Sequence, residues 1–205
     1  MERLWTPWRY SYISGAKPAG RKGVPEELAG WPGEDTGCVF CNLIGAVDWA
    51  IGTGMEVDEA EGYGLIVART ARGFVCLNRY PYASGHVLIV PYRHTDSLAK
   101  LDAAEAAELM VEAQTVERAL RGVYRPDGIN LGMNLGEAAG AGVASHLHLH
   151  VLPRWMGDTN FMTVVAETRI VPELLDQSWK RLREFVKGNS TKETTKFPDS
   201  ATKHM

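Results

Sequence analysis

Three histidines alternate with leucines in one short segment of the chain. Residues 145–154 place His146, His148 and His150 at every second position. In a β-strand, alternate side chains point to the same face, so we expect the imidazoles to line one face while the apolar residues pack into a core behind it. Adjacent imidazoles resist simultaneous protonation, which favours a neutral cluster able to act as nucleophile, metal ligand or proton carrier. The alternative is three solvated imidazoles on an outer sheet face; we interpret this strand as the active site.

Two cysteines suggest a metal site. Cys38 and Cys41 have CxxC spacing, with which two thiolates from one tight turn reach a single tetrahedral ion, although a closed site needs two further ligands. One alternative is a reduced pair in an ordinary turn. A redox pair is disfavoured, because a thioredoxin-like motif should open a helix after a strand. Cys76 lies in an apolar run and is most simply a small core residue.

The elements that must position these residues are mostly strands. Besides the histidine run, short apolar segments predict strands at residues 63–68, 74–78, 86–90, 128–133 and 160–165. A glycine-rich loop precedes the histidine strand. Strands that follow one another directly in sequence favour antiparallel pairing.

Two helices are expected between and after the strands. The first includes residues 103–121 with Gly122 as its stop, and carboxylates such as Glu108 are expected on its solvated face. The second begins near Pro172. The helices do not alternate regularly with the strands, so the fold class is α+β, with an antiparallel sheet of about five strands, a long helix and a C-terminal helix.

Length and composition limit the remaining possibilities. The chain has 205 residues, 45% of them hydrophobic, and a net charge of −3, which suits one globular domain and argues against attraction to nucleic acid. No apolar run reaches membrane-spanning length and the first residues form no signal segment, so we expect a cytoplasmic protein without a membrane partner. We divide the chain into an N-terminal arm (1–36), a domain (37–187) and a polar, mobile tail (188–205).

Further motifs surround the histidine run. They are NRYP at residues 78–81, GHVLIVPYRH at 85–94 and HLHLHVLPR at 146–154. Together they resemble the histidine triad (HIT) family of nucleotide hydrolases and transferases over residues 38–165. The stretch at 131–162 is similar to a narrower branch that includes bacterial diadenosine tetraphosphate phosphorylases and related hydrolases.

The resemblance implies roles for individual residues. His148 attacks the phosphorus of a nucleoside phosphate and forms a nucleotidyl-histidine intermediate, a task suited to a neutral imidazole whose other N–H is held by a backbone carbonyl, for example one from the glycine-rich loop. His150 donates to a phosphate or leaving oxygen, and His86 supports the site from behind, unless it is simply a packed core histidine. Residues implied in nucleotide binding, besides His150, are Asn78, Asn134, Gly140, Gly142 and Ser145. Asn78 has the alternative of a turn-forming residue, and Gly142 is a departure, because many members have Gln there.

The resemblance also implies a metal and a partner. Family members with this CxxC use two histidines that match His94 and His146, which completes a structural zinc site with Cys38 and Cys41 and leaves no position for water. Members commonly pair as dimers by joining their sheets, so we expect a homodimer.

The function implied is cleavage of dinucleoside polyphosphates such as diadenosine tetraphosphate. The partners are then a small nucleotide substrate and, for phosphorolysis, inorganic phosphate; the likeness at residues 131–162 favours phosphorolysis over hydrolysis. Two alternatives stay open: a nucleoside phosphoramidate hydrolase, and a sensor that binds dinucleotides without processing them.

Overall fold

The structure is a computed structural model that describes residues 20–158 and 173–193. The expected strand at 160–165, the helix start near Pro172 and most of the expected tail lie outside these residues. Among the described residues, no helix is both long and apolar enough to cross a bilayer.

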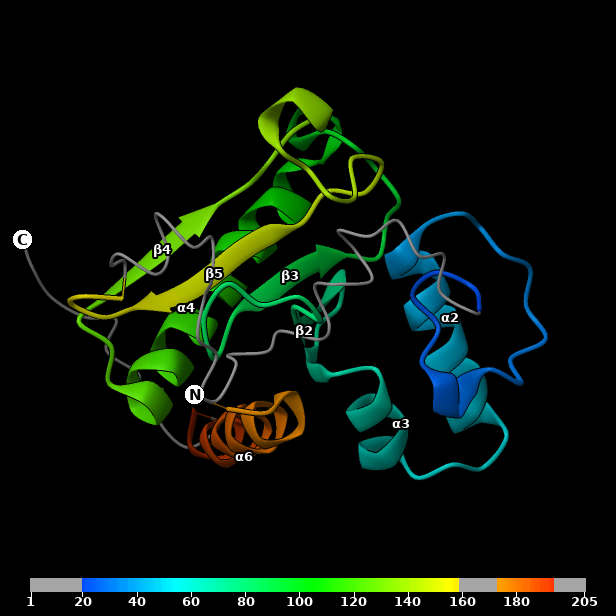
Figure 1. Cartoon of the computed structure of the whole chain (residues 1–205), viewed down its shortest axis with the longest axis horizontal. Coiled ribbons are helices and arrows are strands. Elements are labelled where there is room, and N and C mark those ends of the chain that lie inside the picture. Colours follow the sequence, from blue (N-terminus) through cyan, green and yellow to red (C-terminus); the bar gives the residue numbers. More distant parts are fainter. Residues whose placement is uncertain (1–19, 159–172, 194–205) are drawn as a thin grey trace, which may run out of the picture.

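A five-stranded antiparallel sheet forms the centre of the fold (Figure 1), which confirms the α+β class. The strand order is β1-β2-β3-β5-β4, so the histidine strand lies between β3 and the edge strand β4. The strands are β1 (Ile66–Arg69), β2 (Gly73–Leu77), β3 (Val87–Pro91), β4 (Gly128–Gly132) and β5 (Leu149–Arg154).

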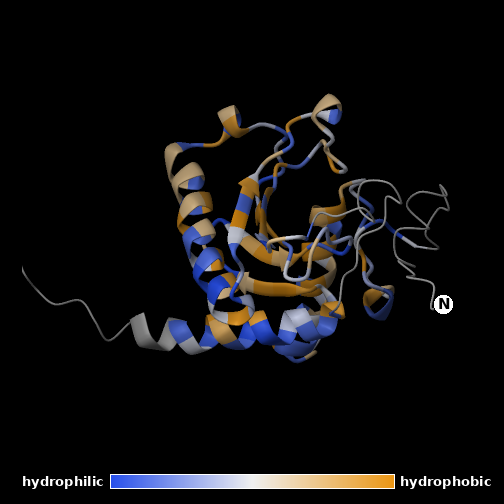
Figure 2. Cartoon of the chain, turned by 60° about the vertical axis from the view of Figure 1, so that its left-hand side comes forward, coloured by the Kyte–Doolittle hydropathy of each residue, from blue (hydrophilic) through white to orange (hydrophobic). Residues whose placement is uncertain are grey.

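One face of the sheet packs on two long helices, α4 (Ala103–Tyr124) and α6 (Leu175–Glu193). Leu147, Leu149 and Val151 are buried in this core, as the alternating pattern predicts. In Figure 2 the strands are mostly hydrophobic in colour, whereas α6 carries both colours, as expected of an amphipathic helix with one buried side.

The other face of the sheet carries the histidines and is covered by elements that were not predicted. These are a short 3₁₀ helix, η1 (Glu26–Leu28), followed by α2 (Val39–Gly52) and α3 (Val57–Tyr63). Alternate residues of β2 and β3 point to this face. Those that do, such as Phe74 and Leu88, form a second core with α2. The strand predicted from Tyr63 is therefore too long: Tyr63 ends α3, and β1 begins only at Ile66.

Both long helices extend beyond their predicted ends. Helix α4 begins with a capping box between Asp102 and Glu105 and continues past Gly122 to Tyr124. Gly122 is not a stop: a Cβ there would lie 2.2 Å from Cε2 of Phe185, so glycine allows α6 to approach α4. Helix α6 runs past Gly188, where the tail was expected to begin, to Glu193.

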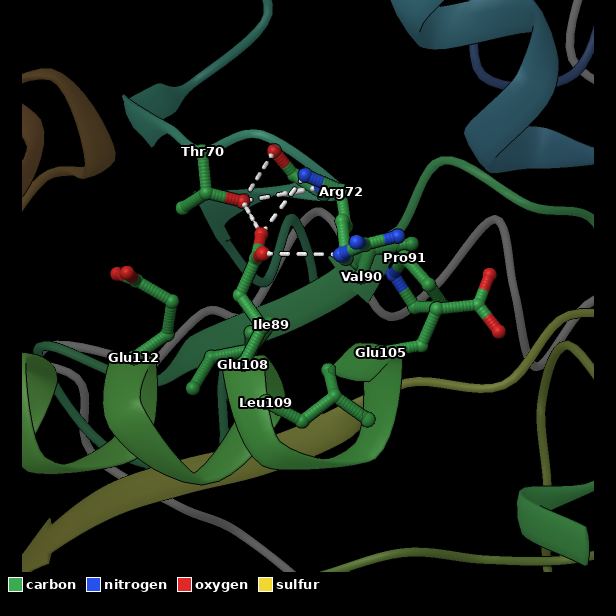
Figure 3. Close-up of a pocket in the computed structure, with 10 residues that line it drawn as sticks. Thr70, Arg72, Ile89, Val90, Pro91, Glu105, Glu108, Leu109 and Glu112 are labelled. Carbon is green, nitrogen blue, oxygen red and sulfur yellow. Dashed lines mark hydrogen bonds and ion pairs between the residues drawn. The ribbon is translucent and has the colours of Figure 1, made fainter. Parts of the chain in front are cut away.

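Glu108 joins α4 to the β1–β2 turn and does not lie on a solvated face (Figure 3). Its carboxylate accepts hydrogen bonds from Oγ1 of Thr70 at 2.5 Å and from the backbone N–H of Arg72 at 2.7 Å. In the small pocket drawn in Figure 3, Thr70, Arg72 and Glu108 are thus engaged with one another. We assign it a structural role.

A buried ion-pair network ties α3, β1 and α6 together. Glu61 is only 2% exposed, and its carboxylate accepts from Nε of Arg69 at 2.6 Å and pairs with the guanidinium of Arg183. Arg183 also donates to the Val67 carbonyl at 2.8 Å and to Asp58 at 2.9 Å. These contacts fix α6 against the edge of the sheet that lies furthest from β4.

Candidate active site and metal centre

His148 is held in one tautomer by the backbone of the neighbouring histidine. Its Nδ1 lies 2.8 Å from the carbonyl oxygen of His146. A carbonyl oxygen only accepts, so Nδ1 must carry the proton and Nε2 keeps a free lone pair. A held N–H was expected, but the acceptor is the carbonyl of His146 and not one from the glycine-rich loop. The prediction that all three histidines lie on a strand was wrong in part, because β5 begins only at Leu149 and His146 and His148 lie in the segment just before it.

His150 is held in the opposite tautomer through His86. The backbone N–H of Tyr82 donates to Nδ1 of His86 at 3.1 Å, so that nitrogen is an acceptor and the proton of the neutral ring is on Nε2. Nε2 of His86 lies 2.9 Å from Nδ1 of His150 and donates to it. His150 therefore carries its own proton on Nε2. His86 is buried, as a core histidine would be, but its hydrogen bonds place it in direct support of His150.

His148 and His150 lie side by side in a largely buried environment, with ring centroids 4.8 Å apart. Burial lowers the pKa of His148, although the His146 carbonyl opposes this shift. Burial, and next the charge that His148 would carry, lower the pKa of His150 to about 4. Both rings are consequently neutral at pH 7, one presenting a lone pair and the other an N–H.

Asn78 lies directly after β2 and is half-buried. Its Oδ1 accepts from the backbone N–H of Tyr80 at 2.9 Å, and its Nδ2 lies 3.3 Å from Nδ1 of His86. The turn-forming role that the sequence left open is thus present, and the amide also contacts the histidine that supports His150.

The predicted phosphate-binding residues are spread along the connection between β4 and β5. Gly140, Gly142 and Ser145 are exposed and Asn134 is half-buried; among the described residues none of them makes a hydrogen bond to the histidines. The backbone N–H of Gly140 already donates to the Glu137 carbonyl at 2.9 Å. The N–H groups of Gly142 and its neighbour Val143 have no backbone acceptor in the described part of the chain, so they are better placed to receive an anion.

Cys38, Cys41, His94 and His146 converge, with all four ligand atoms within 4.8 Å of one another. Nε2 of His146 donates to the Pro91 carbonyl at 2.9 Å, so its Nδ1 lone pair points into the cluster. Nδ1 of His146 is 3.3 Å from Sγ of Cys38, 3.6 Å from Sγ of Cys41 and 3.3 Å from Nδ1 of His94.

The three distances from Nδ1 of His146 fit a tetrahedral ion. Bonds of about 2.3 Å to sulfur and about 2.0 Å to nitrogen in that geometry place ligand atoms roughly 3.3–3.8 Å apart. Without an ion, the thiol protons join sulfur to imidazole nitrogen at these distances, and a bound metal ion would take the place of those protons. The sulfur and nitrogen donors are those that zinc prefers.

The CxxC turn opens a helix, which is one of the two features expected of a thioredoxin-like redox pair; the other is a strand before the turn. Cys38 is the N-cap of α2, but among the described residues a loop and not a strand precedes it. Burial, with a contribution from Cys38, raises the pKa of the Cys41 thiol to about 11. A redox-active thiol needs a lowered pKa, so this environment argues against a redox pair. Metal binding is favoured by the convergence of His94 and His146 on the two cysteines. Cys76 is a buried core residue, as predicted.

Two residues of α2 near the site were missed by the sequence analysis. Phe40 packs against the rings of His146 and His148. Asn42 is fully buried, accepts from Oγ1 of Thr36 at 2.8 Å, and donates to the Lys22 carbonyl at 2.9 Å. The apolar spacing within α2 was the available signal, because Phe40, Leu43, Val47 and Ala50 recur at helical intervals.

Comparison with known proteins gives consistent results. The HIT domain family matches residues 59–156. An AP-4-A phosphorylase of Mycobacterium tuberculosis is 38% identical over 175 residues, which cover 85% of this chain and 79% of that protein. Two crystal structures are similar. The first is a zinc-bound histidine triad family protein from Mycobacterium smegmatis, with a TM-score of 0.55 and 27% identity over 76% of this chain and 96% of that one. The second is a hypothetical histidine triad nucleotide-binding protein from Sulfolobus tokodaii, with a TM-score of 0.57 and 26% identity over 78% of this chain and 100% of that one.

Proposed function

The chain belongs to the histidine triad (HIT) family, and on this basis we propose that it cleaves dinucleoside polyphosphates through a nucleotidyl-histidine intermediate on His148. The observation that carries the proposal is the pair of opposite tautomers on adjacent rings. His148 presents a lone pair and His150 presents an N–H, each fixed by a hydrogen bond on its other nitrogen. This arrangement supports attack on phosphorus beside a departing oxygen.

In the first step, Nε2 of His148 attacks the phosphorus of the phosphate attached to one nucleoside. The N–P bond forms while the bridging P–O bond breaks, and the electron pair leaves with the other nucleotide. The Nδ1–H of His148 stays donated to the His146 carbonyl, which stabilises the positive charge that the ring acquires. The Nε2–H of His150 donates to the oxygen that leaves.

In the second step, an acceptor oxygen attacks the same phosphorus and the N–P bond breaks, which returns His148 to its neutral form. From an adenylyl group, inorganic phosphate as acceptor gives ADP and water gives AMP. We favour phosphate as the acceptor, because the relative from M. tuberculosis is named a phosphorylase.

The substrate-binding residues in this proposal follow from the placement of polar groups around the histidines. Asn78 contacts the ribose, since its half-buried amide adjoins His86. The backbone N–H groups of Gly142 and Val143 bind phosphate oxygens, with Gly140, Ser145 and Asn134 in supporting positions on the same loop.

The metal in the Cys38, Cys41, His94 and His146 cluster is zinc in this proposal. Four protein ligands close the coordination sphere, so the ion contributes stability and not a reactive water. The zinc-bound relative from M. smegmatis supports this choice. We expect about one zinc per chain, measured by atomic emission, to be lost in Cys41→Ser and retained in the matched variant Cys76→Ala. Zinc retained in Cys41→Ser would contradict the assignment.

We also propose a homodimer formed through β4. Among the described residues this strand is at the edge of the sheet, and Leu131 is 45% exposed although its partner in the register, Val151, is fully buried. An open strand edge beside an uncovered apolar side chain is a favourable pairing surface for a second copy.

A product assay tests the reaction. Diadenosine tetraphosphate is incubated with the protein, with and without inorganic phosphate, and nucleotides are separated by chromatography. We expect ATP and ADP when phosphate is present; AMP in place of ADP would mean hydrolysis. Faster turnover of an AMP–amine substrate would favour the phosphoramidate hydrolase, and tight binding without any product would favour the sensor.

A further inference from the structure

Phe40 lies between the Cys–His cluster and the pair formed by His148 and His150, and it has no role in the proposed chemistry of either. It occupies the third position of the CxxC turn and the second residue of α2, and only 5% of it is exposed. Its ring centroid is 5.4 Å from that of His146 at an interplanar angle of 77°, and 5.1 Å from that of His148 at 53°. One side chain therefore packs against a metal-ligating ring and against the nucleophile.

The backbone that carries Phe40 is fixed on both sides. Cys38 and Cys41 flank it and belong to the metal cluster. Just beyond Cys41, the amide of Asn42 accepts from the backbone N–H of Thr36 at 3.0 Å and donates to Oδ1 of Asp35 at 2.6 Å. The preceding loop is thereby bound to the first turn of α2, so the position of the Phe40 ring is constrained more than that of an ordinary core residue.

The nucleophile needs such a constraint. Only one hydrogen bond in the described structure orients the ring of His148, from Nδ1 to the His146 carbonyl. Rotation of the ring by half a turn exchanges Nδ1 with a carbon and breaks that bond, and this torsion is broad and roughly two-fold. One hydrogen bond favours the correct orientation by only on the order of tenfold. A void beside the ring would also admit water that competes for Nδ1–H.

We propose that Phe40 is a positioning residue for the reaction, which packs against the His148 ring so that Nδ1 stays on the His146 carbonyl and Nε2 stays free for attack. The inference rests on the proposed role of His148 as nucleophile. Because Phe40 belongs to the same turn as Cys38 and Cys41, ordering of the metal cluster also orders this packing.

The test compares the metal-loaded protein with three variants, Phe40→Ala, Phe40→Leu and the control Leu43→Ala. Leu43 is also buried in α2 and belongs to the same hydrophobic core, but it has no aromatic ring to stack on the histidines. Nitrogen-15 NMR of the substrate-free protein reports whether Nδ1–H of His148 is present and protected from exchange, and His148→Asn identifies the signal. Zinc content, melting temperature, kcat and KM are measured on the same samples.

We expect Phe40→Ala to retain zinc, to lose the protected Nδ1–H signal, and to lower kcat by about 10-fold to 100-fold with KM changed by less than about threefold. Phe40→Leu should recover part of both. Leu43→Ala should lower the melting temperature while it keeps the signal and kcat.

A zinc-loaded Phe40→Ala protein with the wild-type signal and kcat would overturn the inference. If Phe40→Ala fails to fold or loses zinc, the Nδ1–H signal and kcat of Phe40→Leu provide the test, because leucine preserves most of the side-chain volume. A wild-type protein that shows the protected Nδ1–H but never turns over a dinucleotide would overturn the proposed function, while the NMR comparison would still test the positioning.

Discussion

At the scale of single residues, the chemistry depends on which nitrogen of each histidine carries the proton. The His146 carbonyl accepts from His148, so the proton of that ring is on Nδ1. The Tyr82 N–H donates to Nδ1 of His86, so His86 carries its proton on Nε2 and donates it to Nδ1 of His150, whose own proton is then on Nε2. In the proposed mechanism, these hydrogen bonds give the three rings different roles: His146 is the metal ligand, His148 the nucleophile and His150 the donor. The alternating pattern predicted the shared face, but the tautomers depend on backbone groups that are remote in sequence.

The support that His86 gives to His150 leads to the first prediction. His86→Leu removes the donor to Nδ1 of His150, so that this ring is free to place its proton on the wrong nitrogen. We expect kcat to fall on the order of 100-fold, in the range of an acid–base contribution. His86→Gln, which keeps an amide N–H, should retain more activity than His86→Leu in a steady-state assay. Equal losses in the two variants would mean that the hydrogen bond has no catalytic role.

The pH dependence follows from the lowered pKa values of the same rings. His148 must be neutral to attack, and its pKa lies below the ordinary 6.5, so we expect kcat/KM to persist as pH falls through 6.5 and to be lost only at lower pH. The unfolded chain takes up these protons first, so stability should also decline as pH falls from 6.5 toward about 4, where His150 titrates in the folded protein. An acid limb at or above pH 6.5 would show that the rings are not shielded from water.

At the scale of elements, α6 is attached to the sheet through buried charges. Glu61→Gln removes the carboxylate shared by Arg69 and Arg183 and leaves two guanidinium groups partly unpaired. Each arginine keeps one acidic partner, so we expect a loss of about 3 kcal/mol, at the lower end for a broken buried pair. Chemical denaturation measures this loss, with the exposed Glu27→Gln as control, expected within about 0.5 kcal/mol of wild type. Similar free energies of unfolding for Glu61→Gln and Glu27→Gln would show that the ion-pair network does not stabilise the fold.

The elements predicted correctly are those whose pattern is local. Short apolar runs located β1 to β4, alternation located β5, and the helical pattern of residues 103–121 located α4. Helix α2 was not predicted because the CxxC spacing indicated a tight turn, although Phe40, Leu43 and Val47 recur at helical intervals. Helix α3 is only seven residues long, and its last residue, Tyr63, was assigned to a strand. The attachment of Glu108 to Thr70 was not predictable, because a carboxylate that binds a distant turn has the same sequence signature as a solvated one.

At the scale of the whole molecule, each face of the sheet has its own core. One face packs on α4 and α6 (Figure 1), and the other packs on α2 and carries the histidines and the Cys–His cluster. The resemblance correctly predicted that Cys38, Cys41, His94 and His146 lie together, although Cys38 and His146 are 108 positions apart. The phosphate-binding loop is the weaker part of the prediction, because nothing in its sequence says which N–H groups it uses internally.

The edge of the sheet provides the prediction for assembly. Leu131→Lys places a charge on the uncovered apolar position of β4, so we expect a dimer to dissociate at least tenfold more readily. Sedimentation equilibrium measures this change, with Val57→Lys as control, because Val57 is similarly exposed but lies on α3 near the opposite edge of the sheet. A dimer unaffected by Leu131→Lys, or a monomeric wild type, would contradict pairing through β4.

The central claim is that His148 becomes covalently bonded to phosphorus. The direct measurement mixes the protein with diadenosine tetraphosphate labelled at the phosphorus next to adenosine, quenches within one turnover, and maps the label by mass spectrometry. We predict an acid-labile adenylyl group on His148, absent from His148→Asn, whose turnover should be lower by on the order of 10⁴-fold or more, and present in His204→Asn. Normal turnover of His148→Asn, or an adduct on any other residue, would contradict the account.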